Sequence, residues 1–88
     1  MNGAYSLEFR PAARRALERI PSQDSRRILA KVVQLVDNPV PHGSKKLAGT
    51  GWYRIRVGDY RVVYDVQRDQ LLILVIRIGH RREVYRDL

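Results

Sequence analysis

The feature that most constrains the fold is a two-residue turn signal, Gly58-Asp59, between two segments in which apolar and polar residues alternate. Alternation with a period of two is typical of a β-strand with one buried face. Two such strands separated by a pair of this kind form a hairpin. If these two residues are the loop, Arg56 lies opposite Arg61. The sequence therefore predicts a hairpin over residues 52–66 whose register is already set.

The segments on either side of the hairpin also show clear patterns. Residues 71–78 are almost all apolar, which suits a central strand covered on both faces. Because the 67–70 loop can shift this strand by one residue, the face that Arg77 takes stays open. The other expected elements are a strand at 5–9, a helix from Pro11 to Ile20, a second helix between Ser22 and Asn38, and a loop at 40–51.

These elements follow the order β-α-α-β-β-β and predict an α+β fold. We expect a small, mainly antiparallel sheet with an antiparallel pair of helices on one of its faces. A chain of 88 residues buries only about 60–65% of the surface that it exposes when unfolded. It is therefore expected to form a single domain, residues 1–88, whose functional site is a surface groove.

The charge of the chain is the first functional indication. Lys and Arg number 17 against nine Asp and Glu, so the formal net charge is +8. Only Lys31, Lys45 and Lys46 are lysines, and the planar fork of arginine holds phosphate bidentately. A GC-rich genome would also favour arginine codons. An excess of this size still points to an acidic partner, either nucleic acid or an acidic protein.

The predicted register gathers arginines on the sheet face that the helices leave uncovered. Arg54, Arg56 and Arg61 share this face, and Arg56 lies directly opposite Arg61. Like charges opposed across a sheet destabilise it by about 0.2–1 kcal/mol per pair, so folding gives no reason for this pairing. An anion bound between the two side chains does. The alternative is that each arginine finds its own carboxylate, with Asp59 and Asp65 nearest in sequence.

Several kinds of site have no signal in the sequence. There is no Cys, which excludes disulfides, zinc–thiolate sites and cysteine nucleophiles. The two histidines, His42 and His80, do not stand at metal-ligand spacing, so we expect no metal and no cofactor. No apolar run reaches the roughly 20 residues of a membrane span, and residues 1–9 do not resemble a secretory signal. We therefore expect no contact with a membrane and a cytoplasmic location.

A groove of arginines without a metal fits a small set of reactions, of which RNA cleavage is the most natural. RNA carries its own nucleophile, the 2′-hydroxyl, so the protein needs only to align it, neutralise the phosphate and move two protons. Arginine stays protonated and cannot be the base. Proton transfer then falls to His80 or Tyr85 in the basic tail. Binding of nucleic acid or an acidic peptide without chemistry stays open.

Three segments carry a recognisable pattern, at Lys46–Gly49, Trp52–Tyr64 and Ile78–Tyr85. Together they resemble the RelE/ParE toxin superfamily, and most closely its RelE branch. The resemblance covers nearly the whole chain and implies a RelE-like fold. It implies the toxin of a type II toxin–antitoxin system, a metal-independent mRNA endoribonuclease that cuts in the ribosomal A site. The products would be a 2′,3′-cyclic phosphate and a 5′-hydroxyl.

The resemblance also implies partners and roles for individual side chains. A cognate antitoxin, RelB-like or of another family, would inhibit the toxin, and operator DNA would be bound only through their complex. Arg61 falls on the phosphate-binding arginine of the family. Arg81 falls on the arginine that stabilises the transition state or the leaving group. Tyr85 falls on the tyrosine that orients or activates the 2′-hydroxyl.

One departure from the family pattern affects the choice of acid and base. Arg54 and Arg56 stand where some RelE proteins have lysines, so they can stabilise charge but cannot accept a proton. His80 is a candidate acid, because relatives with a tail histidine use it in this way. The expected catalytic residues are therefore Arg61, Arg81, Tyr85 and His80, and the expected RNA-binding residues are Arg54, Arg56, Lys45, Lys46 and Arg82.

Two other functions stay open on this fold. A ParE-like inhibitor of DNA gyrase shares the architecture but lacks the catalytic tail, so the presence of Arg81 and Tyr85 argues against it. A non-catalytic member of the superfamily would bind its target without cutting it. Cleavage of ribosome-bound mRNA, compared with inhibition of gyrase supercoiling, distinguishes the first function from the second.

Overall fold

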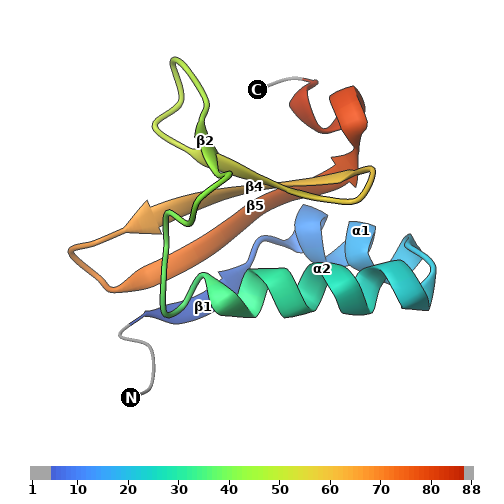
Figure 1. Ribbon diagram of the computed structural model, residues 1–88, viewed down its shortest axis with the longest axis horizontal. Coiled ribbons are helices and arrows are strands. Elements are labelled where there is room, and N and C mark those ends of the chain that lie inside the picture. Colours follow the sequence, from blue (N-terminus) through green and yellow to red (C-terminus); the bar gives the residue numbers. More distant parts are fainter. Residues whose placement is uncertain (1–4, 87–88) are drawn as a thin grey trace.

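Two layers make up the structure, a five-stranded sheet and a pair of helices that cover one of its faces (Figure 1). The computed structural model describes residues 5–86, apart from the side chain of Arg82. The expected α+β architecture is confirmed. In chain order the elements are β1 (Ser6–Phe9), α1 (Pro11–Arg19), α2 (Ser22–Gln34), β2 (Lys45–Lys46), β3 (Tyr53–Val57), β4 (Tyr60–Gln67), β5 (Leu72–His80) and the 3-10 helix η1 (Arg81–Tyr85).

The sheet has the strand order β1-β5-β4-β3-β2. β1 is parallel to β5, and the remaining neighbours are antiparallel. The apolar run at 71–78 forms β5, which lies between β1 and β4 and buries residues on both faces. This agrees with the prediction of a central strand. No helix within residues 5–86 has the length and apolar character that a membrane crossing requires.

The hairpin of β3 and β4 has the predicted register. Val57 pairs with Tyr60, and Arg56 pairs with Arg61. Gly58 has a φ of +60°, which the first position of a type II′ turn requires and which glycine adopts without steric cost. The turn therefore closes directly after Val57 and fixes which side chains share each face of the sheet.

The main core lies between the sheet and the helices. Strand residues from the predicted inner face, such as Ile55, Val62 and Tyr64, pack there against Ala13 of α1 and Ile28 of α2. A fully buried aliphatic side chain contributes about 1.5–3 kcal/mol, so this cluster accounts for the attachment of both helices. It leaves the outer face of β3 and β4 free to carry charged side chains.

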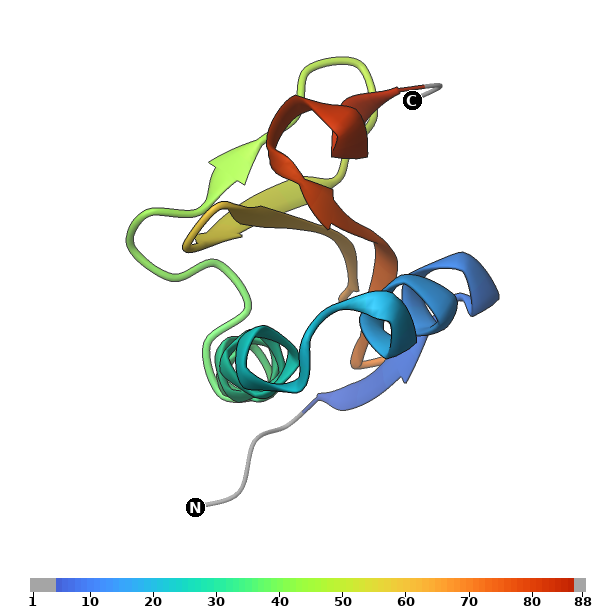
Figure 2. The same ribbon diagram turned by 90° about the vertical axis from the view of Figure 1, so that its right-hand side faces the viewer.

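The tail that follows β5 packs against the sheet. η1 folds back over the outer face of the sheet, on the side opposite α1 and α2 (Figures 1 and 2). Val84 is buried there in a second cluster with Val63 and Ile76, and Trp52 and Tyr85 pack against it. The apolar residues of the tail are too few to show a period, so patterning along the chain does not indicate this contact.

Two further differences concern β2 and β5. The segment expected to be only a loop contains β2, whose two residues pair with β3 and are too short a stretch to show alternation.

A register shift opposite Val63 and Tyr64 inserts Ile76 as an extra residue, so Val63 pairs with Arg77 and Tyr64 with Val75. Arg77 therefore shares the outer face with Val63, which answers the question that the sequence left open.

Candidate functional site

A groove of about 440 Å³ lies on the outer face of the sheet, beside η1. We call it the arginine groove. It is open to solvent, as expected for a chain of this size. Its lining residues are Arg54, Arg56, Asp59, Arg61, Arg81 and Tyr85.

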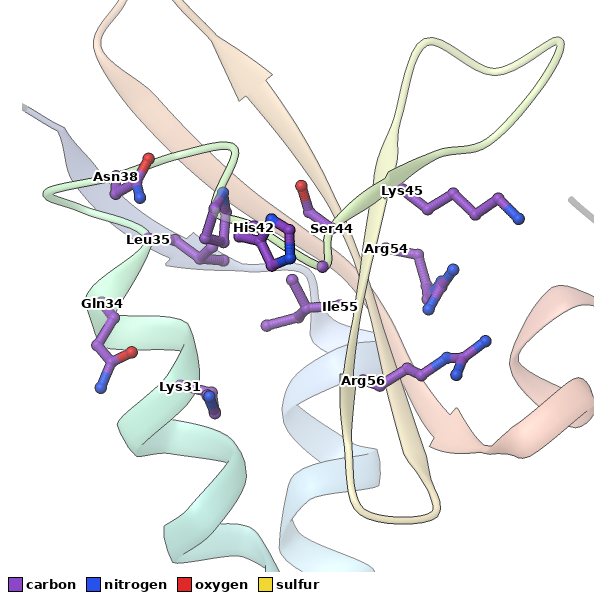
Figure 3. Close-up of a pocket in the computed structure, with 12 residues that line it drawn as sticks. Lys31, Gln34, Leu35, Asn38, His42, Ser44, Lys45, Arg54, Ile55 and Arg56 are labelled. Atoms are coloured by element: carbon purple, nitrogen blue, oxygen red, sulfur yellow. The ribbon is translucent and has the colours of Figure 1, made fainter.

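Strand alternation directs the arginines of β3 into this groove. Ile55 and Val57 are buried in the main core, so Arg54 and Arg56 must point to the other face. Figure 3 shows the side chains of Arg54 and Arg56 on one side of β3, while Ile55 points toward α2. Arg61 joins them because it pairs with Arg56 across the hairpin.

Arg54 is the most unusual charged group in the structure. Only 6% of its surface is exposed, although it carries a full positive charge. Its Nε has no hydrogen-bond partner, and the ion pairs found within residues 5–86 do not include it. A buried charge without an ion-pair partner is unfavourable. Because Arg54 lines the groove, an anion bound there would compensate its charge.

The other arginines keep most of their charge available for a ligand. Arg61 donates only to main-chain oxygens, those of Tyr60 at 3.1 Å and Gly58 at 3.4 Å. Arg81 forms an exposed ion pair with Asp59, with Nη2 at 3.4 Å from Oδ1. Among the described residues, four guanidinium groups and one carboxylate therefore line the groove, and the sum of their charges is positive.

The contacts of η1 fix the position of Tyr85. The half-buried ring packs against the cluster of Val63, Ile76 and Val84 while it also lines the groove. Arg77 donates to the main-chain oxygen of Val84 at 3.4 Å and to that of Arg86. Arg77 thus holds the tail and does not line the arginine groove. This tether keeps the phenol of Tyr85 beside the arginines.

His80 takes the other face of the sheet. It pairs with Tyr60, whose side chain packs against the main core, and its ring meets that of Tyr60 edge-on at 5.4 Å. It lines a separate hollow with Asp24 and Arg27. The structure does not bring this imidazole to the groove, because neighbouring strand residues face opposite ways and Gly79, not His80, pairs with Arg61.

The remaining predicted RNA-binding residues are distributed around the groove. Lys45 pairs with Arg54 and extends on the same side of β3 (Figure 3). It lines a neighbouring groove of about 710 Å³ that also includes Lys31 and Arg56. Lys46 pairs with Tyr53, which packs against the main core, so it does not join the arginines. The side chain of Arg82 lies outside the described part of the chain.

One residue of the groove was not among the candidates from the sequence. Asp59 follows the glycine of the hairpin turn, and its carboxylate reaches Arg81. The hairpin register places it near Arg61, but its contact with the tail depends on where β5 ends. Within residues 5–86, no group of three or more His, Asp or Glu side chains is arranged to hold a metal ion.

Comparison with known families agrees with the fold. Residues 7–85 match the family described as the ParE toxin of the type II toxin–antitoxin system parDE. The chain therefore belongs to the RelE/ParE superfamily of type II toxin–antitoxin toxins. Its relatives place it in the RelE-like branch of that superfamily.

Two relatives and one solved structure illustrate this placement. Toxin RelG of Mycobacterium tuberculosis is 33% identical over 90 residues, covering 93% of this chain and 97% of that protein. The mRNA interferase toxin RelE of Escherichia coli K12 is 27% identical over 88 residues, covering 96% and 93%. The archaeal RelE–RelB complex from Pyrococcus horikoshii superposes with a TM-score of 0.80 at 33% identity, covering 90% of this chain and 97% of that one.

Proposed function

We propose that this toxin is a ribosome-dependent, metal-independent mRNA endoribonuclease and that the arginine groove is its active site. The observation that carries the proposal is the meeting of four guanidinium groups and one phenol in a single open groove. The buried charge of Arg54, which is absent from the ion pairs found within residues 5–86, supports it, because a phosphate in the groove would compensate that charge. The relative named as an mRNA interferase supports the choice of RNA.

The proposed reaction uses the substrate's own nucleophile. The 2′-oxygen attacks the adjacent phosphorus as its proton leaves, the bond from phosphorus to the 5′-oxygen breaks, and that oxygen gains a proton. The products are a 2′,3′-cyclic phosphate and a 5′-hydroxyl. Stabilisation of the charge that grows on the phosphate oxygens is the largest contribution that fixed donors make to such a step.

We assign the steps of this reaction to the side chains of the groove. Arg54, Arg56 and Arg61 hold the non-bridging phosphate oxygens, and Arg81 stabilises the leaving 5′-oxygen. Tyr85 orients and activates the 2′-hydroxyl. Because His80 lies outside the groove, we assign it no proton transfer, and water donates the proton to the leaving oxygen.

We propose three partners for the protein. The first is a cognate antitoxin of the RelB type, since a RelE toxin is found with RelB in the archaeal complex. Its contacting segment would be acidic or amphipathic, to match the net charge of +8. The second is the ribosomal A site with its mRNA, in the cytoplasm. The third is operator DNA, bound only through the antitoxin complex.

The decisive experiment programs purified ribosomes with a defined mRNA and adds the protein. We expect cleavage within the A-site codon, products with a 2′,3′-cyclic phosphate, and full activity in the presence of EDTA once the ribosomes are held intact by polyamines. The Arg61→Ala variant is the control for contaminating nucleases. Intact mRNA after incubation with well-folded toxin would disprove the proposal.

A ParE-like inhibitor of DNA gyrase is the second candidate, because the matching family is named for ParE. Inhibition of gyrase would not require the hydroxyl of Tyr85. To test this function, the same protein preparation is assayed for inhibition of gyrase supercoiling. Inhibition without RNA cleavage would select this function, and cleavage without inhibition would exclude it.

A further inference from the structure

Asp59 is the one carboxylate among the described residues that line the arginine groove. It makes two contacts with the same residue. Its main-chain oxygen accepts a hydrogen bond from the Arg81 N–H at 2.9 Å. Its Oδ1 lies 3.4 Å from Nη2 of Arg81. The turn of the hairpin is thus joined to the first residue of η1 by both main chain and side chain.

Arg81 needs such a support, because its backbone is strained. Its φ is +48°, in the left-handed region that is unfavourable for a residue with a side chain. Strain of this kind costs on the order of 1–3 kcal/mol and persists only where the surroundings enforce it. The left-handed residue turns the chain after His80, so that η1 folds back and Arg81 reaches the groove.

The side-chain contact is not explained by folding stability. Both partners are 64% exposed, and exposed ion pairs contribute at most about 1 kcal/mol. The carboxylate also lowers the positive charge of a groove that would bind phosphate better without it. The hairpin turn explains an Asp at position 59, but it does not explain why the carboxylate is directed at Arg81.

We propose that Asp59 is a positioning residue that fixes the direction of the Arg81 guanidinium. This inference rests on the proposed function. Arginine has long, flexible side-chain torsions, and a fixed donor stabilises a transition state better than one that must be ordered during the reaction. A single contact through Nη2 leaves the other N–H groups of Arg81 free for the leaving oxygen.

If Asp59 positions Arg81, replacing it should lower RNA cleavage without lowering RNA binding. Asp59→Asn removes a negative charge, so it should leave unchanged or strengthen the binding of a non-cleavable 2′-deoxy oligonucleotide. The same change should lower the single-turnover cleavage rate on ribosomes about tenfold, because a neutral amide oxygen holds the Arg81 guanidinium less firmly than a carboxylate does. Asp59→Glu, which keeps the charge, should recover part of the rate. A merely structural role would lower binding and cleavage together.

Control variants distinguish the loss of the Asp59 carboxylate from the loss of a negative charge elsewhere on the protein. Asp69→Asn makes the same change in the β4–β5 turn, which does not line the groove, and should cleave at the wild-type rate. In a cycle with Arg81→Ala, Asp59→Ala should cause no further loss once Arg81 is absent. An equal loss in both backgrounds would mean that Asp59 acts directly, for example as the base, and would overturn the positioning role.

A measurement on the free protein tests the inference without the reaction. The ¹⁵N relaxation of the Arg81 Nε–H group should report a more mobile side chain in Asp59→Asn than in wild type or Asp69→Asn. Unchanged order in Asp59→Asn would overturn the proposal even if the wild type cleaves mRNA. Absence of cleavage by the wild type would instead disprove the proposed function, and the relaxation data would still decide what Asp59 does.

Discussion

The choice of arginine over lysine determines what individual side chains of the groove can do. The four cations found to line it within the described part of the chain are guanidinium groups, which stay protonated at any pH that the protein survives. They can hold and neutralise a phosphate, but none of them can accept a proton from the 2′-hydroxyl. Proton transfer therefore depends on Tyr85 and solvent.

Replacing Arg61 should remove activity without damage to the fold. Its side chain donates only to two main-chain oxygens at the surface, so Arg61→Ala should change the free energy of unfolding by less than about 0.5 kcal/mol. The cleavage rate on ribosomes should fall about 10²–10³-fold, as it does when one transition-state donor is removed. Arg68→Ala, in the exposed β4–β5 turn, is the matched control. Growth arrest by well-expressed Arg61→Ala would remove this residue from the mechanism.

Tyr85 and His80 should respond very differently to substitution. Tyr85→Phe keeps the ring that packs on Val84 but loses the hydroxyl, so RNA binding should persist while cleavage falls about 10²–10⁴-fold. His80→Ala should stay within a few-fold of wild type, because the imidazole contacts Tyr60 outside the groove. Single-turnover rates on ribosomes check both. A His80→Ala variant as slow as Tyr85→Phe would show that the tail rearranges when RNA binds.

The helices and strands show where patterns in the sequence are informative and where they are not. The hairpin and its register follow from a turn signal and a period of two, so the sequence alone is enough to group Arg54, Arg56 and Arg61. The extra residue at Ile76 has no such signal, since a bulge changes pairing without changing composition. The positions of Arg77 and His80 relative to the groove, and the contact of Asp59 with Arg81, depend on that strand, which is why the sequence could not provide them.

Close contact between β5 and η1 should make Gly79 intolerant of larger residues. A Cβ at this position would lie 3.2–3.4 Å from the Cα, Cβ and Cγ2 atoms of Val84. Gly79→Ala should therefore push η1 away from the sheet and destabilise the fold by about 1–3 kcal/mol. Because Tyr85 moves with η1, cleavage should fall more than RNA binding. Val84→Ala should not rescue this variant, because the two closest atoms of Val84, Cα and Cβ, are present in alanine too. Unchanged stability and cleavage in Gly79→Ala would refute the steric explanation.

The attachment of the 39–44 segment to β4 should make stability depend on pH in the alkaline range. The hydroxyl of Tyr64 donates to the main-chain oxygen of Pro39 at 2.7 Å, and burial raises the pKa of Tyr64 from 10.0 to about 12. The folded state therefore keeps this proton at pH values where the unfolded state loses it. Stability is complete below about pH 10 and falls as the pH rises toward 12, by an amount on the order of 2 kcal/mol.

Urea titrations of wild type and Tyr64→Phe across pH 9–12 measure this effect. The variant should be less stable at neutral pH by about 1 kcal/mol, because it loses one hydrogen bond, and its stability should decline less steeply above pH 10. A parallel decline in the two proteins would assign the alkaline transition to other groups.

The net charge of +8 is spread over the whole molecule, and the arginine groove holds only part of it. Arginines of α1 and of the β4–β5 turn lie away from the groove and are exposed. They attract any polyanion at long range and are screened by salt. The groove differs because its arginines face one another and include the buried Arg54. The salt dependence of RNA binding should therefore distinguish phosphate contacts in the groove from long-range attraction by the other arginines.

Binding of a non-cleavable 2′-deoxy oligonucleotide should weaken with salt in proportion to the phosphates neutralised. Each contact with a single strand contributes about 0.7 to the slope of log K against log salt, so engagement of three or four phosphates predicts a slope of about −2 to −3. Arg61→Ala should reduce the size of the slope by about 0.7, whereas Arg15→Ala, on the exposed surface of α1, should change it less. Equal changes in the two variants would mean that the protein binds RNA through its general charge, and that phosphate has no defined position between Arg56 and Arg61.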